Sequence, residues 1–510
     1  MKKKSRILRW TALALLGSML AGCGAATTSP YQRPELSMPG VWQGAKADQV
    51  GKKDANAAAK SKNAEVLKGL SPESLATRAL GFHDPELGRL LAAVLERNND
   101  LAAAAFKVRQ ARLTAGLKAD ALMPTASVEI NGEYSKKLDK SGSDTSHSAS
   151  GSLAYEVDLW GKLAKERDMA TWEADATDED LRATALSLIG TTAELYFDIA
   201  YLNESIALGQ ASITRGAKTL ELAQVRYGVG ADNSLDVLQA KRDLAKLRAN
   251  QEDLLRQLAV KRTAMAVLLD GPPEGVVIDP KNLPHGALPT VQEGLPAEVL
   301  GRRPDLRAAE LRLRKALLNV DVKRVSYYPT FTLTGTLGST SSALVEVVQN
   351  PVAALLAGVT FPFLQWNEMK LNIKLAKAEY EQSVVEFRQA LYEALKEVED
   401  ALSSRQYYAA QGAKLAEALD SATKVEKLYE DRYRLGADTM QNWLDAQESR
   451  QDTETSLLAN RLNRLINYVT LYQALGGEPI KPTKQAKSTK TITPSPGQVA
   501  SINLRSSATH

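Results

Sequence analysis

One thiol stands out among the residues whose chemistry could serve a function. Cys23 is the only cysteine in the 510-residue chain, and it closes the tetrapeptide Leu20-Ala21-Gly22-Cys23. A lone thiol cannot form an intrachain disulfide or a multi-thiolate metal site, so its useful chemistry is modification of the sulfur itself. The histidines have no second His or Cys at ligand spacing: His83, His147, His285 and His510. Neither a phosphate-binding glycine loop nor a nucleophile elbow occurs, so we expect no enzymatic activity, no cofactor and no bound metal.

The residues before Cys23 predict export and lipidation. Basic residues at 2–4, 6 and 9 precede an apolar run at 10–20 that is too short to cross a bilayer as a helix. Residues 1–22 are therefore predicted to be a secretory signal peptide. The tetrapeptide resembles the bacterial lipobox, in which the cysteine receives a diacylglyceryl group and becomes the N-acylated end of the mature protein. Gly24 stands where an inner-membrane retention signal usually has Asp, which favours sorting to outer-membrane lipid.

Composition narrows the class of protein further. With 44% hydrophobic residues and a net charge of +4, the chain can bury a large core and has no strong electrostatic bias. We therefore expect no nucleic-acid partner. Beyond the signal peptide no stretch of about eighteen apolar residues occurs, so any membrane crossing is expected to use β-strands.

The chain contains an internal duplication. The segment Arg226-Tyr227-Gly228-Val229-Gly230-Ala231-Asp232 reappears 206 residues later as Arg432-Tyr433-Arg434-Leu435-Gly436-Ala437-Asp438, and the two share five of seven residues. Met123-Pro124-Thr125 and Tyr328-Pro329-Thr330 precede β-like segments at nearly the same offset. The sequence thus predicts two copies of one fold unit.

Each unit is predicted to contain a long helix, shorter helices and a pair of strands. Apolar residues from Leu181 to Ile206 alternate spacings of four and three, and the same rhythm runs from Val384 to Ala401, which indicates heptad seams. Proline is absent from 163–227, so we predict one helix of about 97 Å there. Glycines in this helix could ease its bending: Gly190, Gly209 and Gly216. Shorter helices are predicted at 85–121, 235–269, 296–325 and 441–475, and strands at 125–135, 148–159, 330–338 and 353–363.

These elements give a domain organisation by residue range. After the signal peptide at 1–22, residues 23–80 form the lipidated N-terminus, a tether and an equatorial segment. The first repeat is 81–270, the connection 271–296 and the second repeat 297–476, and a polar, disordered tail is expected at 477–510.

The strand count predicts assembly. Each strand has about the length that a tilted strand needs to cross a membrane, but barrels of this kind start at about eight strands. An open sheet edge in lipid would leave unpaired backbone groups at a cost of several kcal/mol each. Four strands therefore indicate a chain that shares its barrel with copies of itself. Two hairpins lying in water remain the alternative at this point.

The chain resembles the outer-membrane efflux factor family, the TolC-like proteins, and its lipoprotein branch in particular. The resemblance rests on Cys23 and on stretches in a characteristic order: Tyr31-Gln32-Arg33-Pro34, Phe82-His83-Asp84-Pro85-Glu86-Leu87, Asp158-Leu159-Trp160-Gly161-Lys162, Gly301-Arg302-Arg303-Pro304-Asp305-Leu306 and Glu397-Val398-Glu399-Asp400-Ala401-Leu402. It implies a mainly α fold with a transmembrane β segment, in a homotrimer whose 12-stranded β-barrel continues into a periplasmic α-helical barrel. The implied function is the outer-membrane duct of a tripartite efflux pump, with a periplasmic adaptor protein and an inner-membrane resistance-nodulation-division pump as partners.

The duplicated Arg-Tyr segments are predicted to form helix-turn-helix tips. Gly230 and Gly436 suit a positive φ at a helix end, and three residues could cap the helices that follow: Asn233, Ser234 and Thr439. The resemblance places the tips at the periplasmic mouth, with a gate formed by Asp236, Gln239, Gln441, Asn442, Trp443 and Asp445. It also implies adaptor contacts at the tip turns: Arg226, Gly230, Ala231, Asp232, Arg432, Gly436, Ala437 and Asp438.

Two other interpretations stay open on sequence grounds. An Asp in the first turns of a helix also favours the helix dipole when it simply faces water, so Asp236 and Asp445 need not line a gate. A coiled-coil envelope scaffold or adhesin would carry the same lipobox and long helices without a pore.

Overall fold

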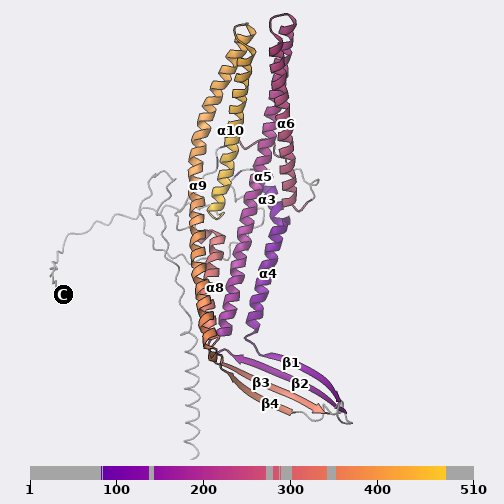
Figure 1. The fold of residues 1–510 in the computed structure, drawn as a ribbon, viewed down its shortest axis with the longest axis vertical. Coiled ribbons are helices and arrows are strands. Elements are labelled where there is room, and N and C mark those ends of the chain that lie inside the picture. Colours follow the sequence, from indigo (N-terminus) through magenta and orange to yellow (C-terminus); the bar gives the residue numbers. More distant parts are fainter. Residues whose placement is uncertain are drawn as a thin grey trace, which may run out of the picture.

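The computed structural model describes residues 82, 84–136, 143–271, 279–286, 288, 301–341 and 352–477. The predicted signal peptide, Cys23, the tether and nearly all of the tail lie outside this part of the chain. Figure 1 shows an elongated molecule in which long helices run to two tips at one end and a small sheet lies at the other.

Two long helices dominate the fold and were predicted. Helix α5 (Lys162–Gly228) has 67 residues and α9 (Trp366–Arg434) has 69, so each is about 100 Å long. At the tips the chain returns through α6 (Ser234–Leu268) and α10 (Met440–Ala474). The half nearer the sheet contains α4 (Asn99–Asp120) and α8 (Pro304–Val325), which flank the long helices (Figure 1). Within the described ranges, no helix is apolar over a length that would cross a bilayer.

The single helix predicted at 85–121 is wrong. The structure has two helices there, α3 (Pro85–Arg97) and α4, because Asn98 is extended (ψ 128°) and caps α4. Its side-chain oxygen accepts the Asp100 and Leu101 amides at 3.0 and 3.2 Å, and its amide donates to the Leu268 carbonyl at 3.1 Å. The described α8 likewise begins at Pro304, inside the predicted range 296–325, since proline suits the first helical position.

The core lies where α3, α5, α6 and α10 meet. Half of the predicted α5 seam is buried there: Leu188, Thr192, Ile199 and Leu202. On α9 most of the predicted seam is buried, with Val398 completely enclosed. The heptad pattern therefore identified the helix faces that pack together.

Three glycines on the long helices make room for amide side chains. A Cβ on Gly209 would lie 2.3 Å from Gln251 Oε1, and one on Gly412 would lie 2.6 Å from Asn460 Oδ1. Gln251 donates to the Ile206 carbonyl at 3.2 Å, and Asn460 donates to the Tyr408 carbonyl at 3.1 Å. Gly190 meets Gln473 in the same way. These glycines allow close helix approach, whereas the sequence had suggested bending.

The four strands form one antiparallel sheet in the order β1-β2-β3-β4 (Thr125–Lys136, Ser143–Val157, Thr330–Ser341 and Val352–Thr360). Because side chains alternate, the register gives the sheet two unlike faces. One face is mainly apolar and includes Val128, Ile130, Tyr134, Leu153, Tyr155, Phe331, Leu333, Leu337, Leu355 and Val359. The other is rich in hydroxyl and acidic groups: Ser127, Glu129, Glu133, Ser148, Ser150, Ser152, Thr332, Thr334 and Thr336. Strand β4 departs from this pattern with Leu356 on the polar face.

Candidate functional site

The turns at the two tips have the same geometry. Gly230 and Gly436 have φ of 75° and 71°, as predicted, which a side chain would disfavour. In the first tip the Ala231 amide donates to the Arg226 carbonyl at 2.8 Å and the Gly230 amide donates to the Tyr227 carbonyl at 3.0 Å. The second tip has both hydrogen bonds at the equivalent residues. Each turn is a Schellman motif, so the duplicated sequence codes for a duplicated helix end.

The returning helices are capped by side chains. Asn233 accepts the Asp236 amide at 3.1 Å, and the Asp236 carboxylate accepts the Asn233 amide at 3.4 Å, which completes a capping box. Thr439 caps α10 by accepting the Asn442 amide at 3.3 Å. Ser234, the other predicted cap, is the first residue of α6. The Asp236 carboxylate therefore stabilises the first turn of α6.

A polar cluster joins the two tips within the protomer. Arg226 Nε lies 3.0 Å from both carboxylate oxygens of Asp232, and the Tyr433 hydroxyl donates to the same carboxylate. The Arg226 guanidinium lies 4.8 Å from the centre of the Tyr433 ring and donates to the Arg434 carbonyl at 3.3 Å. Burial, followed by the hydrogen bond to Asp232, raises the pKa of Tyr433 above its ordinary value. Tyr433 thus stays a neutral donor that ties α9 to the first tip.

An apolar cluster lies directly beneath these polar contacts. It consists of Ala223, Ala240, Tyr433, Met440, Trp443 and Leu444. Trp443 stacks on Tyr433 with ring centroids 5.3 Å apart and planes at 28°. The prediction that Trp443 narrows an entrance is wrong, since its side chain is only 4% exposed and packs inside the protomer. Periodicity identified α10 as a helix but did not show which side of it the indole occupies.

The other predicted gate residues lie on α6 and α10 near the tips. Asp445 is exposed and accepts from Gln441 Nε2 at 2.5 Å. Asn442 instead bonds to Asp438 at 2.7 Å, and Asp438 lies 3.2 Å from Arg432. The hydrogen bonds from Asn442 and the Thr439 amide, with the charge of Arg432, lower the pKa of Asp438. The structure therefore brings Gln441 to Asp445 and Asn442 to the second tip turn, while Asp236 and Gln239 are half-buried on α6.

Asp445 begins an acidic stripe that sequence reasoning missed. Glu448 and Asp452 follow it at helical spacing, and all three line a shallow groove of about 450 Å³ between α9 and α10. Lys246 of α6 lies 2.5 Å from Glu448. The signal for this stripe in the sequence was the spacing of three and four residues between its acidic side chains along α10. Among the described residues, no group of three His, Cys, Asp or Glu side chains has the arrangement of a metal site.

The comparisons with known proteins agree with this architecture. The family model described as outer membrane efflux protein matches residues 90–271 and 295–477. The pyoverdine export outer membrane protein OpmQ of Pseudomonas putida is 31% identical over 408 residues, which cover 78% of this chain and 87% of that protein. The toluene efflux pump outer membrane protein TtgI of Pseudomonas putida is 29% identical over 90% of this chain and 96% of its own length.

Solved structures show the same fold. The open state of the MtrE outer membrane channel of Neisseria gonorrhoeae has a TM-score of 0.73 and 26% identity, over 90% of this chain and 99% of that one. The outer-membrane channel OprN has a TM-score of 0.76 at 21% identity, over 89% of this chain and 99% of that one, and supports the fold alone. The chain therefore belongs to the outer membrane efflux protein family. Fold and relatives together make it an outer-membrane efflux channel protein, as the sequence resemblance predicted.

Proposed function

We propose that this chain is one subunit of a homotrimeric exit duct whose sheet lies in the outer membrane. The observation that carries the proposal is the apolar face of the sheet, where Val128 is 81% exposed, Leu355 77% and Ile130 76%. Water is a poor solvent for such a continuous apolar surface. Hydrocarbon suits this face, and the hydroxyl-rich face suits an aqueous lumen.

The sheet is also incomplete by itself. Its edge strands are β1 and β4, each paired on one side only within the described sheet. An unpaired edge is costly in lipid, and copies placed side by side would pair β4 of one with β1 of the next. Three copies supply twelve strands, enough to close a barrel.

The tips are the proposed gate of this duct. A ring of copies would bring their α6 and α10 helices together around the axis, with Asp236, Gln239, Gln441, Asn442 and Asp445 near the mouth. The contact of Arg226, Asp232 and Tyr433 would hold the tips in one arrangement. This contact is largely buried, with the Arg226 and Asp232 side chains 20% and 7% exposed. Hydrogen bonds to a charged group contribute about 1.5–3 kcal/mol each, so a partner protein that binds the tips could rearrange such a latch.

The partners follow from the same assignment. A periplasmic adaptor protein would dock on the tip turns, where Gly230, Ala231, Gly436 and Ala437 are exposed and small. An inner-membrane resistance-nodulation-division pump would supply the energy. Cys23 would carry the diacylglyceryl and N-acyl groups that add an anchor to outer-membrane lipid. Since relatives are named for toluene and pyoverdine, we propose small organic compounds as the cargo.

Reconstitution in planar lipid bilayers tests this function. A duct should give discrete current steps from purified mature lipoprotein and should run as a trimer in mild detergent. A stable monomer without current steps would contradict the proposal and would favour the scaffold interpretation. Globomycin treatment, which blocks lipoprotein processing, should leave the precursor uncleaved if Cys23 is lipidated.

A further inference from the structure

The duplication allows each helix to be compared with its counterpart in the other repeat. Helices α4 and α8 both have 22 residues and begin 205 residues apart, and α5 and α9 end 206 residues apart. Their neighbours differ, however. Helix α8 packs against both long helices, whereas the main helix contacts of α4 are with α5. One side of α4 therefore lacks the neighbour that its counterpart has.

Exposure of apolar residues marks this open side of α4. Leu318 and Val322 of α8 are 6% and 7% exposed, while their counterparts Leu113 and Leu117 on α4 are 61% and 72% exposed. Phe106 is exposed on the same helix. We call this the α4 face: Phe106, Lys107, Leu113 and Leu117. These leucines occupy positions that are buried when a second long helix is present.

Helix α9 has the matching open side. Glu179 of α5 is buried against α8, where Arg307 reaches it at 2.7 Å. Its counterpart on α9, Val385, is 62% exposed. Other exposed residues continue this side, and we call the set the α9 face: Leu371, Leu375, Glu379, Val385, Glu386 and Tyr392.

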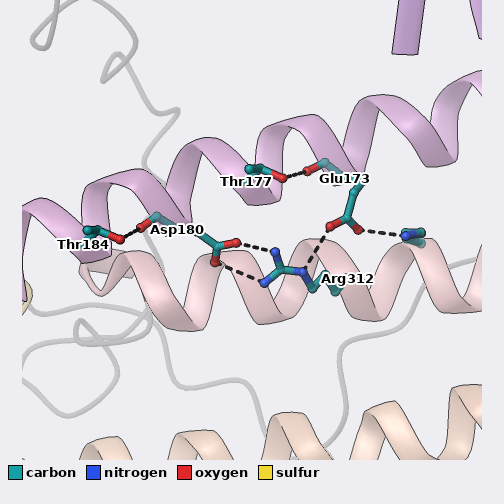
Figure 2. Close-up of polar contacts among 6 residues, drawn as sticks. Glu173, Thr177, Asp180, Thr184 and Arg312 are labelled. Carbon is teal, nitrogen blue, oxygen red and sulfur yellow. Dashed lines mark hydrogen bonds and ion pairs between the residues drawn. The ribbon is translucent and has the colours of Figure 1, made fainter. Parts of the chain in front are cut away.

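Charged residues show how the two faces would fit. Figure 2 shows Arg312 of α8 reaching toward Asp180 and Glu173 of α5. Arg312 Nη1 lies 3.1 Å from Asp180, Arg312 Nε lies 3.4 Å from Glu173, and Lys315 lies 2.8 Å from Glu173. Burial opposes ionisation of Glu173, but the bonds and charges of Lys315 and Arg312 outweigh it and lower its pKa. The contact is an ionised network between the two repeats.

Three of these four residues keep their charges in the other repeat, while the counterpart of Lys315 is the uncharged Gln110. Lys107 stands for Arg312, Glu379 for Glu173 and Glu386 for Asp180. Lys107 is exposed and has no ion pair within the described part of the chain. Glu379 and Glu386 are exposed and accept only from amides, those of Asn319 at 3.3 Å and Gln382 at 2.7 Å. A cation and two anions are thus left at equivalent positions on opposite sides of the protomer.

We propose that the α4 face of one copy docks on the α9 face of a second copy, with Lys107 bridging Glu379 and Glu386. This contact repeats the α5–α8 contact between chains and rests on the proposed assembly, for which it names the joining surfaces. Because the two faces differ, the interface is head-to-tail, the type that can close into a ring. Leu113 and Leu117 would be covered as Leu318 and Val322 are.

Charge exchange across the interface tests the proposal. Lys107→Glu alone, or Glu379→Lys with Glu386→Lys, should raise the dissociation constant of the oligomer at least about tenfold, since like charges would meet. The triple variant restores opposite charges and should recover the wild-type oligomer. Arg109→Glu lies on the same helix but outside the α4 face, and it should leave the mass distribution unchanged.

Mass photometry in detergent, with circular dichroism to check folding, gives the readout. An unchanged oligomer in the Lys107→Glu variant would overturn the proposed interface. A triple variant that folds but stays dissociated would overturn it as well. Bilayer conductance separates this inference from the function, because a wild-type protein that conducts keeps the duct even if Lys107 proves neutral. A monomeric, non-conducting wild type would remove the duct itself.

Discussion

The hydroxyl of Tyr433 on the second tip donates a hydrogen bond to the carboxylate of Asp232 on the first. Asp232 also binds Arg226, so one carboxylate connects two helical hairpins whose residues are 201 positions apart. The bond lies just above the apolar cluster that contains Trp443. Movement of one tip away from the other requires this contact to break.

Tyr433→Phe should loosen the tips without disturbing the cluster. The ring would still stack on Trp443, while the bond to the Asp232 carboxylate would be lost, at a cost of about 1.5–3 kcal/mol for a hydrogen bond to a charged group. We expect larger or more frequent current steps in planar bilayers. Tyr407→Phe, an exposed position on α9, is the matched control and should behave as wild type. Identical conductance in the two variants would argue against a latch at Tyr433.

Asp445→Ala should raise single-channel conductance. In the proposed ring, three copies of this carboxylate lie near the mouth, where their removal would widen the opening and reduce repulsion. Asp420→Ala removes an exposed, paired carboxylate from α9 and serves as the control. If Asp445→Ala changes neither conductance nor drug leakage, Asp445 does not belong to the gate.

Substitution of a tip glycine should lower the stability of the protein only through its effect on the backbone conformation. A Cβ at Gly230 or Gly436 would meet nothing within 4 Å, so Gly→Ala there should cost about 1–2 kcal/mol for the left-handed conformation only. Gly228→Ala is the control, since its Cβ would also be in open space but the residue is helical. That change should stabilise the protein by about 0.5–1 kcal/mol. Thermal unfolding would measure these opposite signs, and equal shifts would contradict the assignment.

The contact between α5 and α8 should depend on pH through Glu173. Its pKa is lowered in the folded protein, so its stabilisation is present above the unfolded value near 4.5 and is lost as the pH falls through the folded value. Glu173→Gln should therefore be less stable than wild type at pH 7, by up to about 1 kcal/mol for a partly exposed network. The difference should shrink as the pH falls below the unfolded value. Urea unfolding at pH 7 and pH 3 provides the comparison, and a difference that grew in acid would show the sign to be wrong.

Much of the fold was predictable because its signals are local. The Gly230 and Gly436 turns follow from a short repeated segment, and the first strand of each pair begins at the repeated Pro-Thr step, directly after Pro124 and Pro329. The break at Asn98 was missed because no proline marks it and the cap depends on the backbone conformation. The role of Trp443 was predicted wrongly and that of Tyr433 was not predicted, for a different reason. Their positions depend on contacts between tips far apart in sequence, which periodicity does not encode.

The position of α8 between two long helices has a consequence for how a ring of such chains would be built. In a ring of three such chains, half of the contacts between neighbouring repeats lie within one polypeptide. The rate at which these contacts form and their stability do not depend on the protein concentration. The other half of the contacts form between different chains, so they require two molecules to meet and they weaken on dilution. Because each chain contains two repeats, a ring of six similar units assembles from three molecules.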